Sequence, residues 1–254
     1  MKKLFVALAV VASFAALTTA PSADAITYGT PTGESYPYVG GLVTTSSRTG
    51  ERFVYCSGTL ISATVFLTAA HCDIGTETAC VMFDPELSDR SELHCGTFTP
   101  SPLYTHRQND PNDIAVVVFD RPIRGIEPAT VVSEVGFLDA LQASGELNQS
   151  TEFVSVGYGG TEFTNQPGGP TAQFLDTRMF AVGTFNALGP GYLRLSQNPA
   201  TGDAGTCYGD SGGPQFLDDL LVSITITGDI FCKATNVVQR LDTADAQAFL
   251  SQYV

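Results

Sequence analysis

The sequence predicts an all-β protein, either a barrel or a sandwich, because short β-rich runs recur along the whole chain. Clusters of glycine and proline separate these runs, and helical periodicity is convincing only near the C-terminus. All-β chains of 254 residues often form one unit, and an apolar content of 43% is enough for a sizeable core.

The predicted elements follow the turn signals in order along the chain. Asp242 or Thr243 is a suitable N-cap for the C-terminal helix, in which Ala, Phe and Leu residues recur at helical spacing. The β-rich runs cover residues 52–60, 64–69, 114–119, 152–156, 173–182, 192–195 and 215–227, and the helix covers residues 243–253.

The N-terminal residues 1–25 have the pattern of a signal peptide. Lys2 and Lys3 precede an uncharged apolar run over residues 4–17, and Ala23-Asp24-Ala25 is an A-x-A cleavage site. This run is short for a membrane span, and no later stretch is long enough. We therefore expect cleavage after Ala25, secretion, and no membrane association after the leader is removed.

Charge and cysteine content narrow the class of protein further. Acidic residues outnumber basic residues 26 to 12, which argues against nucleic-acid binding. The six cysteines behind a leader predict three disulfides in an oxidising compartment, but six cysteines allow fifteen pairings and the sequence does not choose. The spacing of Cys72, Cys80, His94 and Cys95 fits no common zinc pattern, so no metal is expected.

Three motifs carry the chemistry. The octapeptide 207–214 places Ser211 in a glycine-rich turn, which can expose a hydroxyl and direct backbone N–H groups to one point. His71 stands beside a cysteine, and Asp113 stands at the head of an apolar run. A serine hydroxyl needs a base to accept its proton, and histidine is the side chain that titrates near neutrality.

These motifs, in the order His, Asp, Ser, resemble the trypsin/chymotrypsin family of serine proteases from residue 26 to about residue 241. The resemblance implies one protease domain, residues 26–254, with two six-stranded antiparallel barrels and an active site in the cleft between them. The first barrel would cover about 26–128, the second about 129–242, and the C-terminal helix about 243–254. The compact leader and the lack of one disulfide common in animal relatives resemble bacterial members.

The resemblance also implies an activity and a role for each site residue. Ser211 would be the nucleophile, His71 the general base, and Asp113 the group that orients the histidine. The backbone N–H groups of Gly209 and Ser211 would form the oxyanion hole. The expected function is a secreted, monomeric endopeptidase that hydrolyses protein or peptide substrates through an acyl-enzyme without a cofactor.

Activation and disulfide pairing follow from the same resemblance. The family pairs the carboxylate before the serine, here Asp210, with a new N-terminal isoleucine, here Ile26, so that leader cleavage alone would activate the enzyme. The implied disulfides are Cys56–Cys72, Cys207–Cys232 and, for the remaining two cysteines, Cys80–Cys95.

The resemblance also implies a primary specificity pocket, whose residues are found by counting from the cysteines. Gly205 would form its base with Thr206 adjacent, Gly228 one wall and Asn236 the opposite wall. These residues favour small or medium uncharged side chains, although Asp203 and Asp229 stand near enough in the sequence to attract a cation at the rim.

One departure from the family pattern leaves alternatives open. Ile226-Thr227-Gly228 replaces the Ser-Trp-Gly strand, so the hydroxyl that usually supports the triad aspartate is missing unless Thr225 or Thr227 supplies it. A non-catalytic binding protein on the same scaffold is therefore an alternative. An esterase is another, because Gly209–Gly213 matches the Gly-x-Ser-x-Gly pattern, although the triad order fits an α/β hydrolase poorly.

Overall fold

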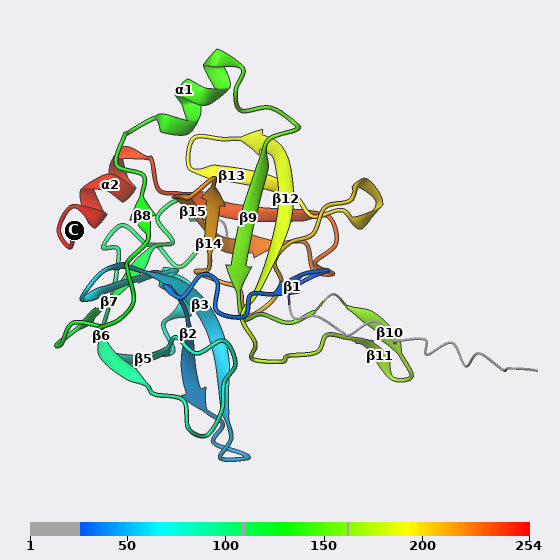
Figure 1. The fold of residues 1–254 in the computed structure, drawn as a ribbon. Coiled ribbons are helices and arrows are strands. Elements are labelled where there is room, and N and C mark those ends of the chain that lie inside the picture. The colour runs from blue at the N-terminus through cyan, green and yellow to red at the C-terminus, as the bar shows by residue number, and fades with distance from the viewer. Residues whose placement is uncertain (1–25, 108–109, 162) are drawn as a thin grey trace, which may run out of the picture.

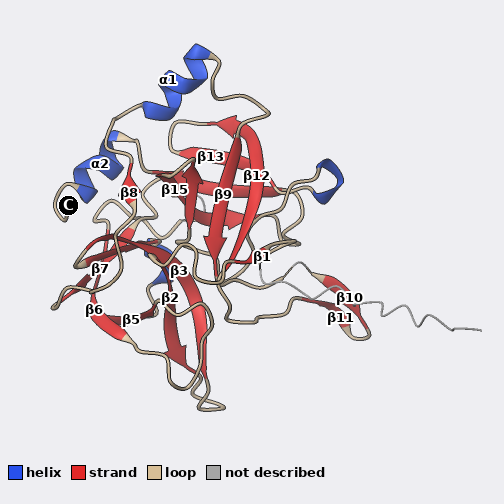
Figure 2. Ribbon diagram, viewed as in Figure 1, coloured by secondary structure: helices blue, strands red, loops and turns tan. Residues whose placement is uncertain are grey.

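The computed structural model of the protein describes residues 26–107, 110–161 and 163–254, so the predicted signal peptide lies outside the described residues. Strands dominate the molecule and form two barrels that pack against each other (Figures 1 and 2). Within the described ranges, no helix is long and apolar enough to cross a membrane.

The first barrel is closed by six antiparallel strands in the order β2-β3-β4-β7-β6-β5. Its interior is filled by aliphatic and aromatic side chains such as Phe66, Leu67 and Val116, which are fully buried. The strands are β2 (Val39–Thr45), β3 (Arg52–Ser62), β4 (Val65–Thr68), β5 (Thr78–Met82), β6 (His94–Pro100) and β7 (Ala115–Phe119).

The second barrel is closed in the same way, because β12 pairs with both β13 and β9 in the order β9-β12-β13-β16-β15-β14. Its strands are β9 (Glu152–Gly157), β12 (Met179–Leu188), β13 (Tyr192–Ser196), β14 (Pro214–Leu217), β15 (Leu220–Gly228) and β16 (Thr235–Arg240). The predicted fold class, two six-stranded antiparallel barrels with a C-terminal helix, is confirmed.

Smaller elements border these barrels. Strand β1 (Thr30–Pro31) pairs with β12, so the N-terminal segment lies on the second barrel, and β8 (Thr130–Val131) runs parallel to β15. Strands β10 (Thr164–Gln166) and β11 (Gly169–Thr171) form a separate hairpin.

Two predicted runs differ from the strands observed. The run 215–227 is a hairpin, in which the chain reverses at Asp218, a residue with a φ of 52°. In the run 173–182 the strand begins only at Met179, because Asp176 has a positive φ of 49° and interrupts the extended chain.

The structure contains two α-helices in its described part, one of which the sequence did not indicate. The C-terminal helix α2 (Ala244–Leu250) is capped by the Thr243 side chain, which accepts a hydrogen bond from the N–H of Ala246. The unexpected helix α1 (Phe137–Ser144) is only eight residues long. The Asp242 carboxylate accepts a hydrogen bond from its Leu138 N–H at 2.8 Å, so a residue distant in the sequence stabilises this helix.

A buried arginine joins the two barrels. Arg178, which precedes β12 of the second barrel, is 1% exposed and donates to the carbonyls of Val39 and Phe83 in the first barrel at 3.0 and 2.9 Å. It also donates to the Tyr158 hydroxyl, which in turn donates to the Asp84 carbonyl at 2.7 Å. These hydrogen bonds fix the two barrels relative to each other.

Candidate active site

His71 and Asp113 form a hydrogen-bonded pair on the first barrel. His71 lies in the short 3-10 helix η1 (Ala70–Cys72) after β4, and its backbone N–H donates to Asp113 Oδ1 at 2.9 Å. Its ring Nδ1 lies 2.6 Å from Asp113 Oδ2. An ionised carboxylate only accepts, so it holds the proton on Nδ1 and leaves Nε2 free to accept one.

Ser211 lies on a tight turn that the second barrel presents to the first. Gly209 and Gly212 have φ values of 97° and 80°, a conformation that favours glycine. The Ser211 carbonyl accepts from the Ser57 N–H at 2.8 Å, and the Gly212 N–H donates to the Thr225 carbonyl at 2.7 Å. Both barrels therefore hold the turn in place.

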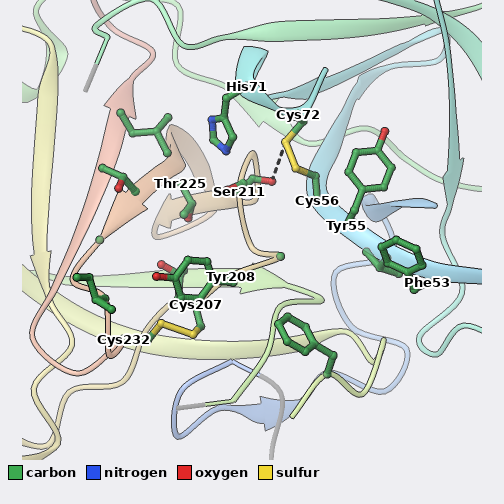
Figure 3. A pocket seen from close by; sticks show the side chains of 18 of the residues that line it. Phe53, Tyr55, Cys56, His71, Cys72, Cys207, Tyr208, Ser211, Thr225 and Cys232 are labelled. Carbon is green, nitrogen blue, oxygen red and sulfur yellow. Dashed lines mark hydrogen bonds between the residues drawn. A yellow bond between two sulfur atoms is a disulfide. The ribbon is translucent and has the colours of Figure 1, made fainter. Parts of the chain in front are cut away.

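Two backbone donors of this turn have no acceptor in the described chain. Within the described chain, the N–H groups of Gly209 and Ser211 donate to no protein acceptor. The same pocket is lined by His71 and Ser211, whose side chains are neighbours in Figure 3. No hydrogen bond joins these two side chains in the part of the chain described, and such bonds often tighten only when substrate binds.

Three disulfides are present, and they are the pairs that the family resemblance implies. Cys56–Cys72 ties β3 to the histidine turn, and Cys207–Cys232 ties the serine loop to the segment after β15. Cys80–Cys95 joins β5 to β6. The grouping of His71 with Cys56 and Cys72 is not a metal site, because both sulfurs are bonded to each other.

Asp210 is buried without a cationic partner in the described chain. It is 0% exposed, and its two oxygens accept only from the backbone N–H groups of Gly159 at 2.7 Å and Cys207 at 2.8 Å. Burial raises the pKa of Asp210 to about 7. A Cβ added to Gly157 or Gly159 would lie 2.3 or 2.4 Å from this carboxylate, so these two glycines make room for it.

Ile26 lies close to this carboxylate. Its side chain is 0% exposed and packs with Met179 and Ala181. Its nitrogen donates to the Gly159 carbonyl at 3.4 Å, and the Gly159 N–H donates to Asp210. The nitrogen that cleavage after Ala25 would convert to an amine is thus bonded to the residue that contacts Asp210.

The pocket beside Ser211 has a volume of about 890 Å³ and includes two of the four predicted specificity residues, Thr206 and Gly228. Gly205 and Asn236 do not line it. Gly205 packs on the buried Gln197, whose Oε1 would lie 2.4 Å from an added Cβ. Asn236 pairs with Gly228 across β15 and β16 and is 1% exposed.

No sequence pattern indicated much of the pocket wall. Aromatic and aliphatic side chains of Phe53, Tyr55, Ile74 and Phe174 line it, and they come from segments without any motif. Of the two rim acids, Asp229 lines the pocket and Asp203 does not. The Asp229 carboxylate accepts from the backbone N–H groups of Ala234 and Thr235 at 2.8 and 2.9 Å.

No hydroxyl among the described residues replaces the serine hydroxyl that is lost at Ile226. The hydrogen bonds to the Asp113 carboxylate come from His71 alone. The Thr225 hydroxyl instead accepts from Gln215 Nε2 at 2.8 Å. Asp113 therefore lacks the hydroxyl donor expected from the family pattern.

Comparisons with known proteins agree with this arrangement. Residues 27–245 match the family described as Trypsin. A protein named trypsin from Saccharopolyspora erythraea is 25% identical over 202 residues, covering 77% of this chain and 83% of that protein. A chymotrypsin from Phaedon cochleariae is 28% identical over 216 residues, covering 79% of this chain and 72% of that protein.

The fold also bears on the esterase alternative. An α/β hydrolase has a largely parallel sheet with helices on both faces, whereas both barrels here are antiparallel. The match extends over most of the chain and over both barrels. The chain belongs to the trypsin family and is a serine-type endopeptidase.

Proposed function

We propose that this protein is a secreted endopeptidase that hydrolyses peptide bonds with Ser211, His71 and Asp113 as its catalytic triad. The observation that carries the proposal is the His71–Asp113 pair, 2.6 Å apart, beside a serine turn in which two backbone donors have no acceptor in the described chain. The nucleophile, the base and the oxyanion donors thus share one pocket.

The chemistry needs only these groups. Ser211 Oγ attacks the scissile carbonyl carbon while His71 Nε2 accepts its proton. The developing oxyanion is stabilised by the N–H groups of Gly209 and Ser211. His71 then gives the proton to the leaving amine, and water releases the acyl group by the same steps in reverse. Asp113 stabilises the histidine cation throughout, and no cofactor takes part.

The free edge of β15 gives the substrate its direction. Pairing of β15 with β14 ends at Ile224, so the segment from Ile226 to Gly228 is open to the pocket on that side. An extended peptide can add to this edge as a further strand. The acyl half of the substrate then lies on the second barrel, and Thr206 and Gly228 offer its side chain a neutral pocket.

Leader cleavage after Ala25 supplies the activation step in this proposal. The new Ile26 ammonium would pair with Asp210, to which Ile26 is already linked through Gly159. Burial of a lone carboxylate is unfavourable, and a buried cation relieves it. No separate propeptide is needed, and the secreted product acts as a monomer on protein or peptide substrates.

Labelling with a fluorophosphonate tests the triad. Secreted, leader-cleaved protein should be labelled on Ser211, and the label should be lost in Ser211→Ala and in His71→Ala. Ser211→Ala should change the free energy of unfolding by less than about 1 kcal/mol, because the substitution is small and partly exposed. Folded protein that begins at Ile26 but takes no label would contradict the proposal and favour a binding protein.

N-terminal sequencing of the labelled protein tests the activation step separately. A start at Ile26 supports activation by leader removal. Labelled, active protein that starts at Asp24 or earlier would show that Ile26 need not be free.

A further inference from the structure

Exposed apolar side chains gather around Ser211. Among the described residues, eleven large apolar side chains are exposed, and five of them line the pocket that holds Ser211. Contiguous exposed apolar surface on a soluble protein marks a binding site more often than scattered single residues do. The five residues are Phe53, Ile74, Phe174, Tyr208 and Ile230.

Four aromatic or aliphatic side chains that line this pocket come from β3 and from segments next to it in the sequence or bonded to it, and we call them the leaving-group wall: Phe53, Tyr55, Ile74 and Phe174. The Phe174 segment is joined to β3 because the Asp176 carboxylate accepts from the Val54 N–H. Phe53, Ile74 and Phe174 are 39%, 50% and 55% exposed. They come from β3, from the loop after η1 and from the segment before β12, so three separate parts of the chain converge there.

The position of this wall follows from the two disulfides that flank Ser211. Phe53 and Tyr55 lie on the side of Cys56–Cys72, whereas Thr225 and Cys207–Cys232 lie on the other side (Figure 3). In the proposed function the acyl half of the substrate lies along β15. The leaving amine must therefore depart toward the first barrel, where His71 protonates it.

The charges near the wall are acidic. The Asp176 carboxylate lines the pocket and accepts from the Val54 N–H at 3.0 Å. Asp73 is close enough to Tyr55 to act on its hydroxyl, and burial together with Asp73 raises the pKa of Tyr55 to about 12. Apart from His71, no basic side chain lines the described pocket. An anionic side chain would find no partner there.

We propose that the leaving-group wall makes this protease select a large apolar residue immediately after the scissile bond. This inference rests on the proposed function, because it takes the Ser211 acyl-enzyme as its starting point. The occupant is the first leaving-group side chain of the substrate, which contacts Phe53, Ile74 and Phe174 while its amine faces His71. Burying an aliphatic or aromatic side chain on this wall supplies the selectivity.

Partitioning of an acyl-enzyme between water and added amines tests the wall without involving the primary pocket. p-Nitrophenyl acetate acetylates Ser211 Oγ and releases p-nitrophenol. An amino-acid amide then attacks the acetyl carbon, which forms an N-acetyl amide and returns the proton to Ser211 Oγ through His71. At equal concentrations of free amine, we expect leucine and phenylalanine amides to trap the acetyl group roughly tenfold better than glycine amide.

Aspartate and arginine amides separate apolar from electrostatic selection. Aspartate amide should trap no better than glycine amide. Equal trapping by all amides, or arginine amide exceeding leucine amide, would overturn the inference, the latter because Asp176 and Asp73 would then govern selection. If neither p-nitrophenol release nor fluorophosphonate labelling occurs, the proposed function itself fails, and with it the inference.

Two variants locate the selectivity on the wall. Phe174→Ser and Ile74→Ser should each reduce the advantage of leucine amide over glycine amide about threefold. Val135→Ser is the matched control, since Val135 is 58% exposed and does not line the pocket, and it should leave the ratio unchanged. An unchanged ratio in both wall variants would contradict the inference. If a variant fails to fold, the order in which the unsubstituted protein prefers the amino-acid amides still tests the inference.

Discussion

Two aspartates, Asp210 and Asp242, are fully buried in the second barrel but differ in their partners. Each is 0% exposed. Asp242 accepts from Arg240 Nε and Nη2, both at 2.8 Å, and from the Leu138 N–H. Asp210 accepts only from two backbone N–H groups. One buried carboxylate has a cation two residues earlier in the sequence, at the end of β16, and the other has none in the described chain.

Under the proposed function, Asp242 is a structural charge, whereas Asp210 gains its cation only when the leader is cleaved. Both members of the Asp242–Arg240 pair belong to the chain as it is synthesised, so no cleavage is needed to supply the cation, and Asp242 also accepts from Leu138 of α1. Asp210 precedes Ser211 directly, and burial raises its pKa to about 7. Under the proposed function, an ammonium at Ile26 would act on the residue next to Ser211, between the two proposed oxyanion donors. The predictions below test this contrast.

Breaking the complete pair should have the largest effect. Asp242→Asn leaves the Arg240 guanidinium, whose side chain is 3% exposed, without its buried partner. Breaking a buried pair by removing one member is strongly destabilising, so we expect a loss of about 5 kcal/mol in the free energy of unfolding. Urea unfolding of the variant measures this loss.

Asp139 supplies the matched control. It also contacts Arg240, but its side chain is 61% exposed. Asp139→Asn should therefore cost less than about 1 kcal/mol. Equal losses in Asp139→Asn and Asp242→Asn would show that burial does not distinguish the two partners.

The lack of a cation beside Asp210 should appear in the pH dependence of the free energy of unfolding. In a chain that keeps residues before Ile26, the native state binds the Asp210 proton more tightly than the unfolded state, whose pKa is near the ordinary value of 3.8. Stability then falls as the pH rises from about 4 to about 7, by on the order of 4 kcal/mol. Chemical unfolding across this range measures the fall.

The leader-cleaved protein should not show this fall, because an Ile26 ammonium keeps Asp210 ionised in the native state. Asp210→Asn in the longer chain should flatten the profile as well. Parallel profiles in the cleaved and uncleaved chains would argue that Ile26 and Asp210 do not pair.

Local patterns predicted an all-β barrel or sandwich and the three motif residues, whereas the two six-stranded barrels were implied by the family resemblance. Gly209 and Gly212 mark the serine turn, and an acid at the head of an apolar run marks Asp113. Helix α1 was not predicted, because it is short and its stabilising contact comes from Asp242, more than one hundred residues away. A contact between residues so far apart in the sequence produces no pattern in the residues around the helix.

The pocket walls were the least predictable part. Phe53, Ile74 and Phe174 carry no motif, and only the packing of two barrels brings them to one surface. Counting from the cysteines placed Gly205 and Asn236 in the pocket, yet neither lines it: Gly205 packs on Gln197, and Asn236 is buried on β16 opposite Gly228. The spacing of residues along the chain does not predict which buried side chain, such as Gln197, packs against a pocket residue.

A substitution at Ser57 tests what sets the pKa of Asp210, and its expected effect on stability is smaller than that of Asp242→Asn. Its buried hydroxyl donates to the Gly209 carbonyl at 2.9 Å and accepts from the Tyr158 N–H at 3.0 Å. Ser57→Ala leaves both backbone groups without that partner, so we expect a loss of about 2 kcal/mol in the free energy of unfolding. The substitution removes no hydrogen bond to the Asp210 carboxylate, so the pH at which stability levels off should stay near 7 in the uncleaved chain.

Thr59 provides the control on the same strand. It is 0% exposed, and its hydroxyl has no hydrogen-bond partner among the described residues. Thr59→Val should therefore be neutral or stabilising, because no partner is left unpaired and a buried polar atom is removed. A shift of the pH midpoint in Ser57→Ala but not in Thr59→Val would mean that the Gly209 carbonyl, and not burial alone, sets the proton affinity of Asp210. Asp210 would then be coupled to the oxyanion turn before any cation arrives.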